Sequence, residues 1–292
     1  MPCYNPKTIK VNEDQYIPVD CRKCIGCIKM YAQTWSIRCI HEKAFSKKSC
    51  FITLTYDSYQ MPDDGKLNHT DFQLFMKRLR RKFEGIKVRY FMTGEYGERN
   101  DRPHYHAILF GVDFKEDRIA VKRKKGYFIY RSELLEGLWK KGFCSLGDVS
   151  SRSVSYVAKY QLYKMDAREN KHYMKCSKRP GLGALWCDEY LGSVIERGYI
   201  VHDKKKYSIP KYYINRVLDP SLKIQGSEVV YGFTSDKIYD VTYDSIMNYK
   251  NKRIEYIKKI EKEKIEKLGY DYLKKEESFQ LEYYRKFNSR YL

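Results

Sequence analysis

Two histidines and a glutamate near the middle of the chain could hold a divalent metal ion. Apolar residues run from Val88 to Glu95 and from His104 to Phe110, and the loop between them is rich in Gly, Asn, Asp and Pro. This pattern predicts an antiparallel hairpin. Side chains two apart on a strand share a face, so His104 and His106 point to one side. The hairpin returns Glu95 beside them, and two imidazoles with a carboxylate form an open metal site.

Two tyrosines and a lysine further along could supply a nucleophile. In the segment Tyr156 to Tyr160, a helix places both tyrosines and Lys159 on one exposed face, because residues four apart are neighbours. Apolar positions lie on the opposite side and would dock this helix: Val154, Val157, Ala158 and Leu162. Structural packing is the alternative for the histidine pair. For the tyrosines, the alternative is that one acts while the other packs or stacks on a base.

Together these residues resemble the motifs of the HUH endonucleases. The resemblance is closest to the replication initiation proteins of the microviruses, of the gokushovirus type. Residues Phe51 to Tyr56 match the first motif, Arg102 to His106 the second, and Tyr156 to Tyr160 the third. The segments Cys21 to Cys27 and Arg179 to Gly183 also look like that family. The resemblance ends near residue 190.

The resemblance implies a phage rolling-circle replication initiator. Such a protein nicks and rejoins single-stranded DNA at the phage origin, and it leaves a 5′-phosphotyrosine and a free 3′-OH. Its partners would be the origin DNA and the host replication machinery, in the cytoplasm of the bacterial host. A plasmid relaxase or transposase of the same class is one alternative. A non-enzymatic, zinc-containing DNA-binding protein is another.

The proposed chemistry needs both groups of residues. A free phenol with a pKa near 10 is a poor nucleophile at neutral pH, so the phosphate must be made electrophilic. A divalent ion on Glu95, His104 and His106 would polarise a nonbridging oxygen. Oxygen and imidazole ligands suit Mg²⁺ or Mn²⁺. Lys159 could hold the phosphate or assist deprotonation of Tyr156 or Tyr160.

A cysteine-rich segment near the start could hold a second metal. Cys21, Cys24 and Cys27 are spaced by two residues, and Cys3 could complete four thiolates for a structural zinc ion. An iron–sulfur cluster and unliganded thiols are the alternatives. Cys39 and His41 could replace Cys3. The nine cysteines are an odd number, which argues against a disulfide framework.

Composition indicates an anionic partner. The chain has 57 basic and 37 acidic residues, a net charge of +20, and 29 tyrosines among the lysines. Nucleic acid is the first candidate, because a single-stranded groove uses cations for the backbone and aromatic rings for the bases. No apolar run approaches the roughly 20 residues that a membrane span needs. The sequence therefore predicts a soluble, cytosolic protein without a membrane partner.

The remaining patterns predict an α+β fold with an antiparallel sheet and helices on one face. Residues 50–56 alternate as a strand with Ile52, Leu54 and Tyr56 toward a core. Thr70 is the predicted N-cap of an apolar-striped helix, and Ser132 caps a shorter one. The basic side of the first helix is either a solvated surface or a phosphate track. Further predicted elements are a helix over 31–45 and strands over 143–149, 207–209 and 211–214.

This order agrees with the ferredoxin-like core that the HUH resemblance implies. We expect a Cys-rich segment and helix over 1–47 and the nicking core over 48–165. A mixed accessory region follows over 166–248, and a charged helical tail over 249–292. The basic run from Lys122 to Lys125 is assigned to a linking segment.

Overall fold

The computed structural model describes residues 3–12, 15–97, 101–124, 126–150, 153–154, 157, 172–217 and 243–289. The chain divides into two compact units, residues 35–188 and residues 1–34 together with 189–292. The four-part division at residues 47, 165 and 248 stays a prediction.

The first unit is built on a seven-stranded sheet with the order β6-β7-β8-β3-β5-β4-β9, in which all neighbours are antiparallel. Along the chain the inner strands and helices run β3-α2-β4-β5-α3-β8, a β-α-β-β-α-β order into which β6 and β7 are inserted between β5 and α3. An antiparallel sheet in an α+β fold is confirmed. The elements are β3 (Ser49–Tyr56), α2 (His69–Lys82), β4 (Arg89–Tyr96), β5 (Pro103–Phe110), β6 (Arg118–Lys124), β7 (Tyr127–Ser132), α3 (Glu133–Trp139), β8 (Gly142–Gly147) and β9 (Tyr173–Cys176).

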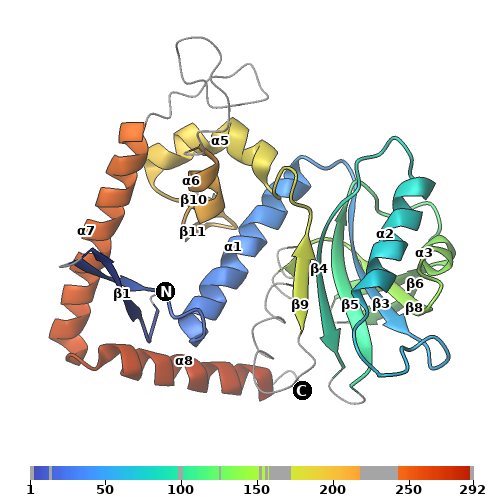
Figure 1. Cartoon of the computed structure of the whole chain (residues 1–292), viewed down its shortest axis with the longest axis horizontal. Coiled ribbons are helices and arrows are strands. Elements are labelled where there is room, and N and C mark those ends of the chain that lie inside the picture. Colours follow the sequence, from blue (N-terminus) through green and yellow to red (C-terminus); the bar gives the residue numbers. More distant parts are fainter. Residues whose placement is uncertain are drawn as a thin grey trace, which may run out of the picture. The chain divides into compact units, whose positions relative to one another are not determined.

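Helices α2 and α3 cover one face of this sheet and enclose the main core (Figure 1). The strand β3 alternates as predicted, with Ile52, Leu54 and Tyr56 buried in that core. The apolar stripe of α2 packs against them through Phe72, Phe75, Met76 and Leu79. Ser132 caps α3, as predicted. The predicted cap of α2 was wrong: Asn68, not Thr70, is the N-cap, and its side chain accepts from the Thr70 amide.

The opposite face is also covered in part, so the prediction of helices on one face was wrong. Helix α1 (Ile25–Ala44) contributes its residues from Trp35 onward to this unit. The Trp35 ring stacks on Phe91 of β4, with centroids 5.0 Å apart. Arg89, at the start of β4, lies 2.6 Å from a carboxylate oxygen of Glu42. These contacts cover the face only near one end of the strands. The predicted start of α1 at residue 31 is six residues late.

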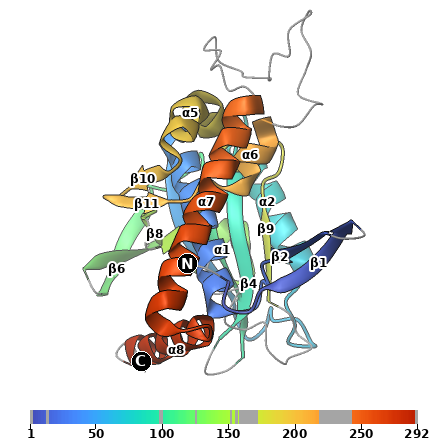
Figure 2. The ribbon, with the colours of Figure 1, turned by 90° about the vertical axis from the view of Figure 1, so that its left-hand side faces the viewer.

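The segment treated as a link between strands is itself a hairpin. β6 and β7 pair along their length, and β7 joins β8, so β6 forms one edge of the sheet (Figure 2). The basic residues of this stretch hide the usual strand signal, because Lys and Arg interrupt the apolar alternation. Short β9, on the other edge, was also missed.

The second unit holds the cysteine-rich segment and the C-terminal helices. Its elements are β1 (Lys7–Asn12), β2 (Gln15–Val19), α5 (Ala184–Arg197, which begins in the first unit), β10 (Ile200–His202), β11 (Lys205–Tyr207), α6 (Lys211–Val217), α7 (Tyr243–Leu268) and α8 (Tyr272–Ser289). The tail is helical, as predicted, with a break at Gly269, where φ is 81°.

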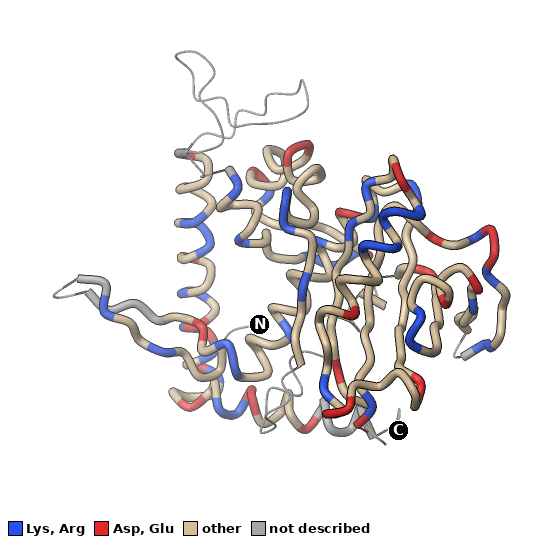
Figure 3. Tube along the Cα trace, turned by 45° about the vertical axis from the view of Figure 1, so that its right-hand side comes forward, with Lys and Arg blue, Asp and Glu red and all other residues tan. Residues whose placement is uncertain are grey.

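The strand predicted over residues 211–214 was wrong, because these residues begin α6. The Tyr213 amide donates to the Pro210 carbonyl, and this turn starts the helix. Of the strand predicted over 207–209, only Tyr207 is in a strand. Lysine and arginine are spread along the trace of both units (Figure 3). Among the described residues, no helix combines the length and apolarity needed to cross a membrane.

Candidate active site

Three neighbouring strands place the predicted ligands on one face of the sheet. Strands β4 and β5 pair so that Glu95 lies opposite His104 and Thr93 opposite His106. On the other side of β5, Thr53 of β3 lies opposite His106. Residues directly opposite each other in a sheet share a face. The hairpin therefore brings the glutamate and both histidines together, as predicted.

The three side chains are in direct contact. Glu95 Oε1 lies 2.8 Å from Nε2 of His104 and 2.8 Å from Nε2 of His106. The two imidazole rings stand nearly perpendicular, with centroids 4.9 Å apart. One possible ligand atom from each residue lies within 4.8 Å of the others. A set of two imidazole nitrogens and one carboxylate can surround a single divalent ion.

The ring nitrogen that does not face Glu95, Nδ1, has a partner in each histidine, and this partner fixes the orientation of the ring. Nδ1 of His106 lies 2.9 Å from Oγ1 of Thr53, and the Phe51 ring stacks on the same imidazole. Nδ1 of His104 lies 3.1 Å from the backbone oxygen of Arg102. Metal-binding histidines are usually held in this way through the nitrogen that does not bind the metal. Both Nε2 atoms thus stay directed at the carboxylate.

The contact between His104 and Glu95 requires a positive charge. A carbonyl oxygen only accepts, so Nδ1 of His104 donates to the Arg102 carbonyl. In a neutral ring Nε2 then presents a lone pair to Glu95 Oε1, which is also an acceptor. This contact is favourable only if His104 takes a second proton or a cation lies between the two atoms. Glu95 Oε2 is buried and has no hydrogen-bond partner among the described residues. These residues therefore fit a metal ion.

The pKa directions agree with a cation site. Burial raises the pKa of the Glu95 carboxyl, but hydrogen bonds from His104 and His106 outweigh burial and hold the pKa below its ordinary value. Burial lowers the pKa of His106, although the Glu95 carboxylate acts in the opposite direction. At neutral pH the site therefore holds an ionised carboxylate and a neutral His106, the protonation states that bind metals.

The other face of β5 anchors the strand. The Tyr105 hydroxyl, between the two histidines in sequence, donates to the Asn68 carbonyl at 2.7 Å and lies 3.0 Å from the Tyr56 hydroxyl. Tyr56 donates to the buried carboxylate of Asp71 at 2.8 Å. This network fixes the rotation of β5 about its axis. It therefore fixes the direction of both imidazoles.

Arg102 positions the site and was not predicted to do so. Its guanidinium donates to the Tyr56 carbonyl at 2.9 Å and to the Ser58 hydroxyl at 3.2 Å. These bonds hold the backbone carbonyl that accepts from His104. In the sequence, Arg102 is the first residue of the motif that contains both histidines, but the motif does not indicate which contacts its side chain makes.

Tyr156, Lys159 and Tyr160 lie outside the described residues. The segment before them starts with a reciprocal cap, in which the Ser153 amide donates to Oγ of Ser150 and the Ser150 amide donates to Oγ of Ser153. Val154 and Val157 are helical and fully buried. Residues three apart share a helix face, so these two valines satisfy the predicted docking side. The position of the tyrosines relative to the histidines stays a prediction.

The chain is similar to known replication-associated proteins of phages. The model of the replication-associated protein ORF2/G2P family matches residues 49–165. The chain is 34% identical over 206 residues to replication-associated protein VP4 of Bdellovibrio phage phiMH2K. It is 29% identical over 215 residues to replication-associated protein ORF2 of Spiroplasma virus 4, and 28% over 210 residues to ORF4 of Chlamydia phage 1. The chain is thus similar to phage replication-associated proteins, which supports its resemblance to the microvirus replication initiators.

These matches cover 66%, 68% and 67% of this chain. They span 65% of the Bdellovibrio phage protein, 67% of the Spiroplasma virus protein and 52% of the Chlamydia phage protein. No solved structure matches the chain. The family match contains all the residues of the histidine site and the paired tyrosines.

The second unit of the chain brings four thiols together. The Sγ atoms of Cys3, Cys21, Cys24 and Cys27 all lie within 4.8 Å of one another. Two of the separations, Cys21 to Cys27 and Cys3 to Cys24, are 3.9 Å. Zinc bonded to sulfur at about 2.3 Å in a tetrahedron gives sulfur separations of about 3.8 Å. Cys3 completes this group, and neither Cys39 nor His41 belongs to it.

Backbone amides point at these sulfur atoms. The Cys24 and Lys23 amides donate to Sγ of Cys21 at 3.3 and 3.4 Å, and the Tyr4 amide donates to Sγ of Cys24 at 3.2 Å. Burial raises the pKa of the Cys21 thiol, but the amides and neighbouring thiols outweigh it and bring the pKa to about 7. Donors aimed at sulfur stabilise thiolates, which are the metal-binding form. Burial raises the pKa of the Cys3 and Cys27 thiols, so these two thiols would lose their protons when a metal binds. The sulfur separations and the amide donors fit a single metal ion.

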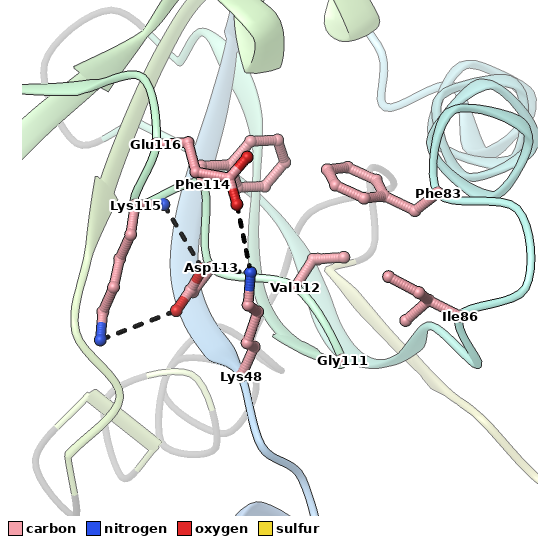
Figure 4. A pocket seen from close by; sticks show the side chains of 9 residues that line it. All are labelled: Lys48, Phe83, Ile86, Gly111, Val112, Asp113, Phe114, Lys115 and Glu116. Carbon is pink, nitrogen blue, oxygen red and sulfur yellow. Dashed lines mark hydrogen bonds and ion pairs between the residues drawn. The ribbon is translucent and has the colours of Figure 1, made fainter.

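A small pocket lies at the other end of β3 and β5. It is lined by Lys48, Phe83, Ile86 and the segment from Gly111 to Glu116 (Figure 4). Lys48 Nζ lies 3.4 Å from Glu116 and 4.0 Å from Asp113. Because these carboxylates pair with lysines of the same pocket, we assign it no part in the candidate site.

Proposed function

We propose that this chain is a metal-dependent HUH-class endonuclease that nicks and rejoins phage DNA through a tyrosine. The observation that supports this most directly is the contact of Glu95 with both histidines, with a buried carboxylate oxygen left without a hydrogen-bond partner among the described residues. The β-α-β-β-α-β order of the inner sheet agrees with the core expected of that class. The phage relatives support replication-origin DNA as the substrate.

Glu95, His104 and His106 would hold Mg²⁺ or Mn²⁺. The bound ion would polarise a nonbridging phosphate oxygen and stabilise the charge that develops on it. Thr53 and the Arg102 carbonyl keep the two rings aimed at the ion. The site face near the histidines carries small polar side chains, Thr53 and Thr55, both only partly buried. Such a surface leaves room for a sugar and phosphate.

Tyr156 or Tyr160 would attack the phosphorus atom. The phenolic oxygen forms a bond to phosphorus, the bond to the 3′ oxygen breaks, and that oxygen takes up a proton. The 5′ phosphate stays on the tyrosine, and Lys159 would hold the phosphate or assist deprotonation of the phenol. Rejoining is the reverse step with a new 3′-OH. The phosphotyrosine keeps the energy of the ester, so no nucleoside triphosphate is required.

The function is tested by covalent capture of a single-stranded oligonucleotide from the phage origin. With Mn²⁺ or Mg²⁺ we expect a protein–DNA adduct that survives denaturing electrophoresis, and with excess chelator we expect none. A non-enzymatic DNA-binding protein would shift the oligonucleotide in a native gel but form no adduct. That outcome, with the full chain and a range of origin fragments, would overturn the proposal.

We also predict an effect of Thr53→Val, which removes the partner of His106 Nδ1 but keeps the size of the side chain. Loss of an outer partner of a metal-binding histidine typically weakens metal affinity by about 10- to 100-fold. Calorimetric titration with Mn²⁺ should show this loss, while adduct formation at saturating Mn²⁺ is largely kept. Thr55→Val, two residues along on the same strand, is the matched control. Equal affinities in both variants would contradict a positioning role for Thr53.

We further propose a structural zinc ion on Cys3, Cys21, Cys24 and Cys27. Four thiolates close the coordination sphere, so this metal would take no part in cleavage. Elemental analysis of the purified chain should give about one zinc per molecule. Cys3→Ser should lower that content and destabilise the protein, because structural zinc contributes to folding free energy. Cys39→Ser is the control, since Cys39 lies outside the group. Iron would point to an iron centre, and absence of both metals would end the proposal.

A further inference from the structure

The β6–β7 hairpin carries an uncompensated basic tip. Residues 118–132 contain six Lys or Arg residues and no Asp or Glu. At the base, Arg118 lies 2.9 Å from Asp148, and Arg131 makes two short bonds to Glu136. Lys122 and Arg123, nearer the tip, have no ion pair among the described residues. The base charges thus fix the hairpin, while the tip charges are available to a partner.

Exposed apolar side chains accompany these cations. Tyr127 and Phe128 are 52% and 49% exposed, and Ile119 and Val121 on β6 are 68% and 58% exposed. Large aromatic rings in a charged, exposed hairpin are unfavourable in water unless a partner covers them. The hairpin tip is therefore both basic and apolar, which is unusual for a solvated edge strand.

The strand register places an aromatic ring beside a cation on one face of the tip. Arg123 lies opposite Phe128, and its guanidinium lies 5.4 Å from the centre of the Phe128 ring. Successive residues alternate between faces, so the half-exposed ring of Tyr127 belongs to the opposite face. The tip therefore offers a ring paired with a cation on one face and a second ring on the other.

A bulge in β6 aligns the basic residues. The register shifts between Ala120 and Lys122, so Val121 is the extra residue. Without the shift, Arg118 and Arg123 would point to opposite faces, because they are five residues apart. With it, both lie over rings of one face, Arg118 over Tyr130 at 4.3 Å and Arg123 over Phe128. The face is a row of alternating cations and rings.

The tip also extends beyond the strand that supports it. β7 pairs with β8 at Tyr130 opposite Leu146, and β8 ends at Gly147. The tip residues Tyr127 and Phe128 therefore reach past the end of β8. The two strands are joined through Gly126, whose φ of 86° suits glycine in a tight turn. Such a projecting hairpin can contact a partner on both faces.

We infer that the tip of the β6–β7 hairpin, residues 119–124 and 126–129, binds single-stranded DNA outside the nicking site. Unpaired bases stack on aromatic rings while cations contact the phosphates. A duplex keeps its bases stacked on one another, so it would leave the rings of Tyr127 and Phe128 uncovered. The inference rests on the proposed DNA substrate but not on cleavage. It assigns an additional binding surface to a segment with no ligand of the metal site.

The test measures the affinity for single-stranded DNA under conditions in which no cleavage is expected. A fluorescent oligothymidylate is titrated with the full chain in excess chelator, at several salt concentrations. Phe128→Ala should weaken binding roughly 5- to 100-fold, as expected for loss of one stacked base, and Phe128→Tyr should keep it. Removing both cations, as Lys122→Gln with Arg123→Gln, should lower the slope of log affinity against log salt by about 1.4, since each phosphate contact on a single strand contributes about 0.7.

A matched charge control comes from helix α7. Lys258 and Lys262 are exposed residues of that helix, so Lys258→Gln with Lys262→Gln removes the same charge elsewhere. Unchanged affinity in the hairpin variants, or an equal loss in the α7 control, would overturn the inference. A larger loss on duplex DNA than on the single strand would also overturn it. Thermal melting checks that the variants are folded.

A second readout separates this inference from the proposed function. Adduct formation with origin DNA is measured at saturating DNA and Mn²⁺. A hairpin variant that binds weakly but forms adduct at saturation supports both proposals. If the hairpin variants keep normal DNA affinity and also form the adduct, only the inference about the hairpin is overturned. If the hairpin variants bind DNA weakly and even the unmodified chain forms no adduct, only the proposed endonuclease function is overturned.

Discussion

Glu95→Gln is expected to abolish metal-dependent cleavage. Glutamine keeps the size of the side chain but removes the negative charge that both His104 and His106 contact at 2.8 Å. Loss of a ligand should exceed the 10- to 100-fold effect of losing an outer partner, so adduct formation should fall by about 100-fold or more. The measurements are the adduct yield with origin DNA and calorimetric titration with Mn²⁺.

The control for this variant is Glu116→Gln, which removes an equal charge from an exposed side chain of the small pocket. It should keep both metal affinity and cleavage. DNA affinity in chelator should be similar for all three proteins, because binding does not require the metal. Full cleavage by the Glu95→Gln protein, or by the unmodified chain in excess chelator, would remove the metal from the mechanism.

The paired tyrosines are expected to act in turn. A rolling-circle initiator must cleave once to start and again after one copy, while the first 5′ end is still attached to the protein. Residues four apart on a helix lie on one face, so Tyr156 and Tyr160 could both reach one metal-bound phosphate. Each single variant, Tyr156→Phe or Tyr160→Phe, should still form an adduct. The double variant should form none.

Mass spectrometry of the trapped adduct identifies the tyrosine used in each protein. Tyr163→Phe serves as the control, because Tyr163 lies outside the predicted pair and three residues after Tyr160 in sequence. If one single variant forms no adduct while the other behaves normally, the alternating mechanism fails. A single nucleophile would then stand, with the second tyrosine packing or stacking on a base.

The histidine site could be anticipated because short-range rules determine most of it. A strand fixes the common side of His104 and His106, and a hairpin fixes the return of Glu95. The partners of the two Nδ1 atoms could not be predicted from short-range rules. Thr53 comes from a strand 53 residues earlier in sequence, and the role of Arg102 depends on its contacts with Tyr56 and Ser58.

Long-range packing explains the errors in the fold. Trp35 of α1 covers the second face of the sheet through Phe91, a contact that helical periodicity alone does not predict. The β6–β7 hairpin was missed because its lysines and arginines resemble a linker, although pairing with β8 holds it in the sheet. Asn68 replaced Thr70 as a helix cap because either residue type can cap, and only the backbone angle before the helix decides.

The site joins strands that are distant in sequence, and this makes it a reporter of folding. The ligands Glu95, His104 and His106 lie on the β4–β5 hairpin, and Thr53 of β3 holds the His106 ring. The ligands are therefore fully oriented only when β3 has also paired with β5. A ligand that binds the native chain alone stabilises it by RT ln(1 + [L]/Kd), about 2.7 kcal/mol at a concentration 100 times Kd. If refolding is monitored through Mn²⁺ uptake, the time course should therefore report when the central strands pair.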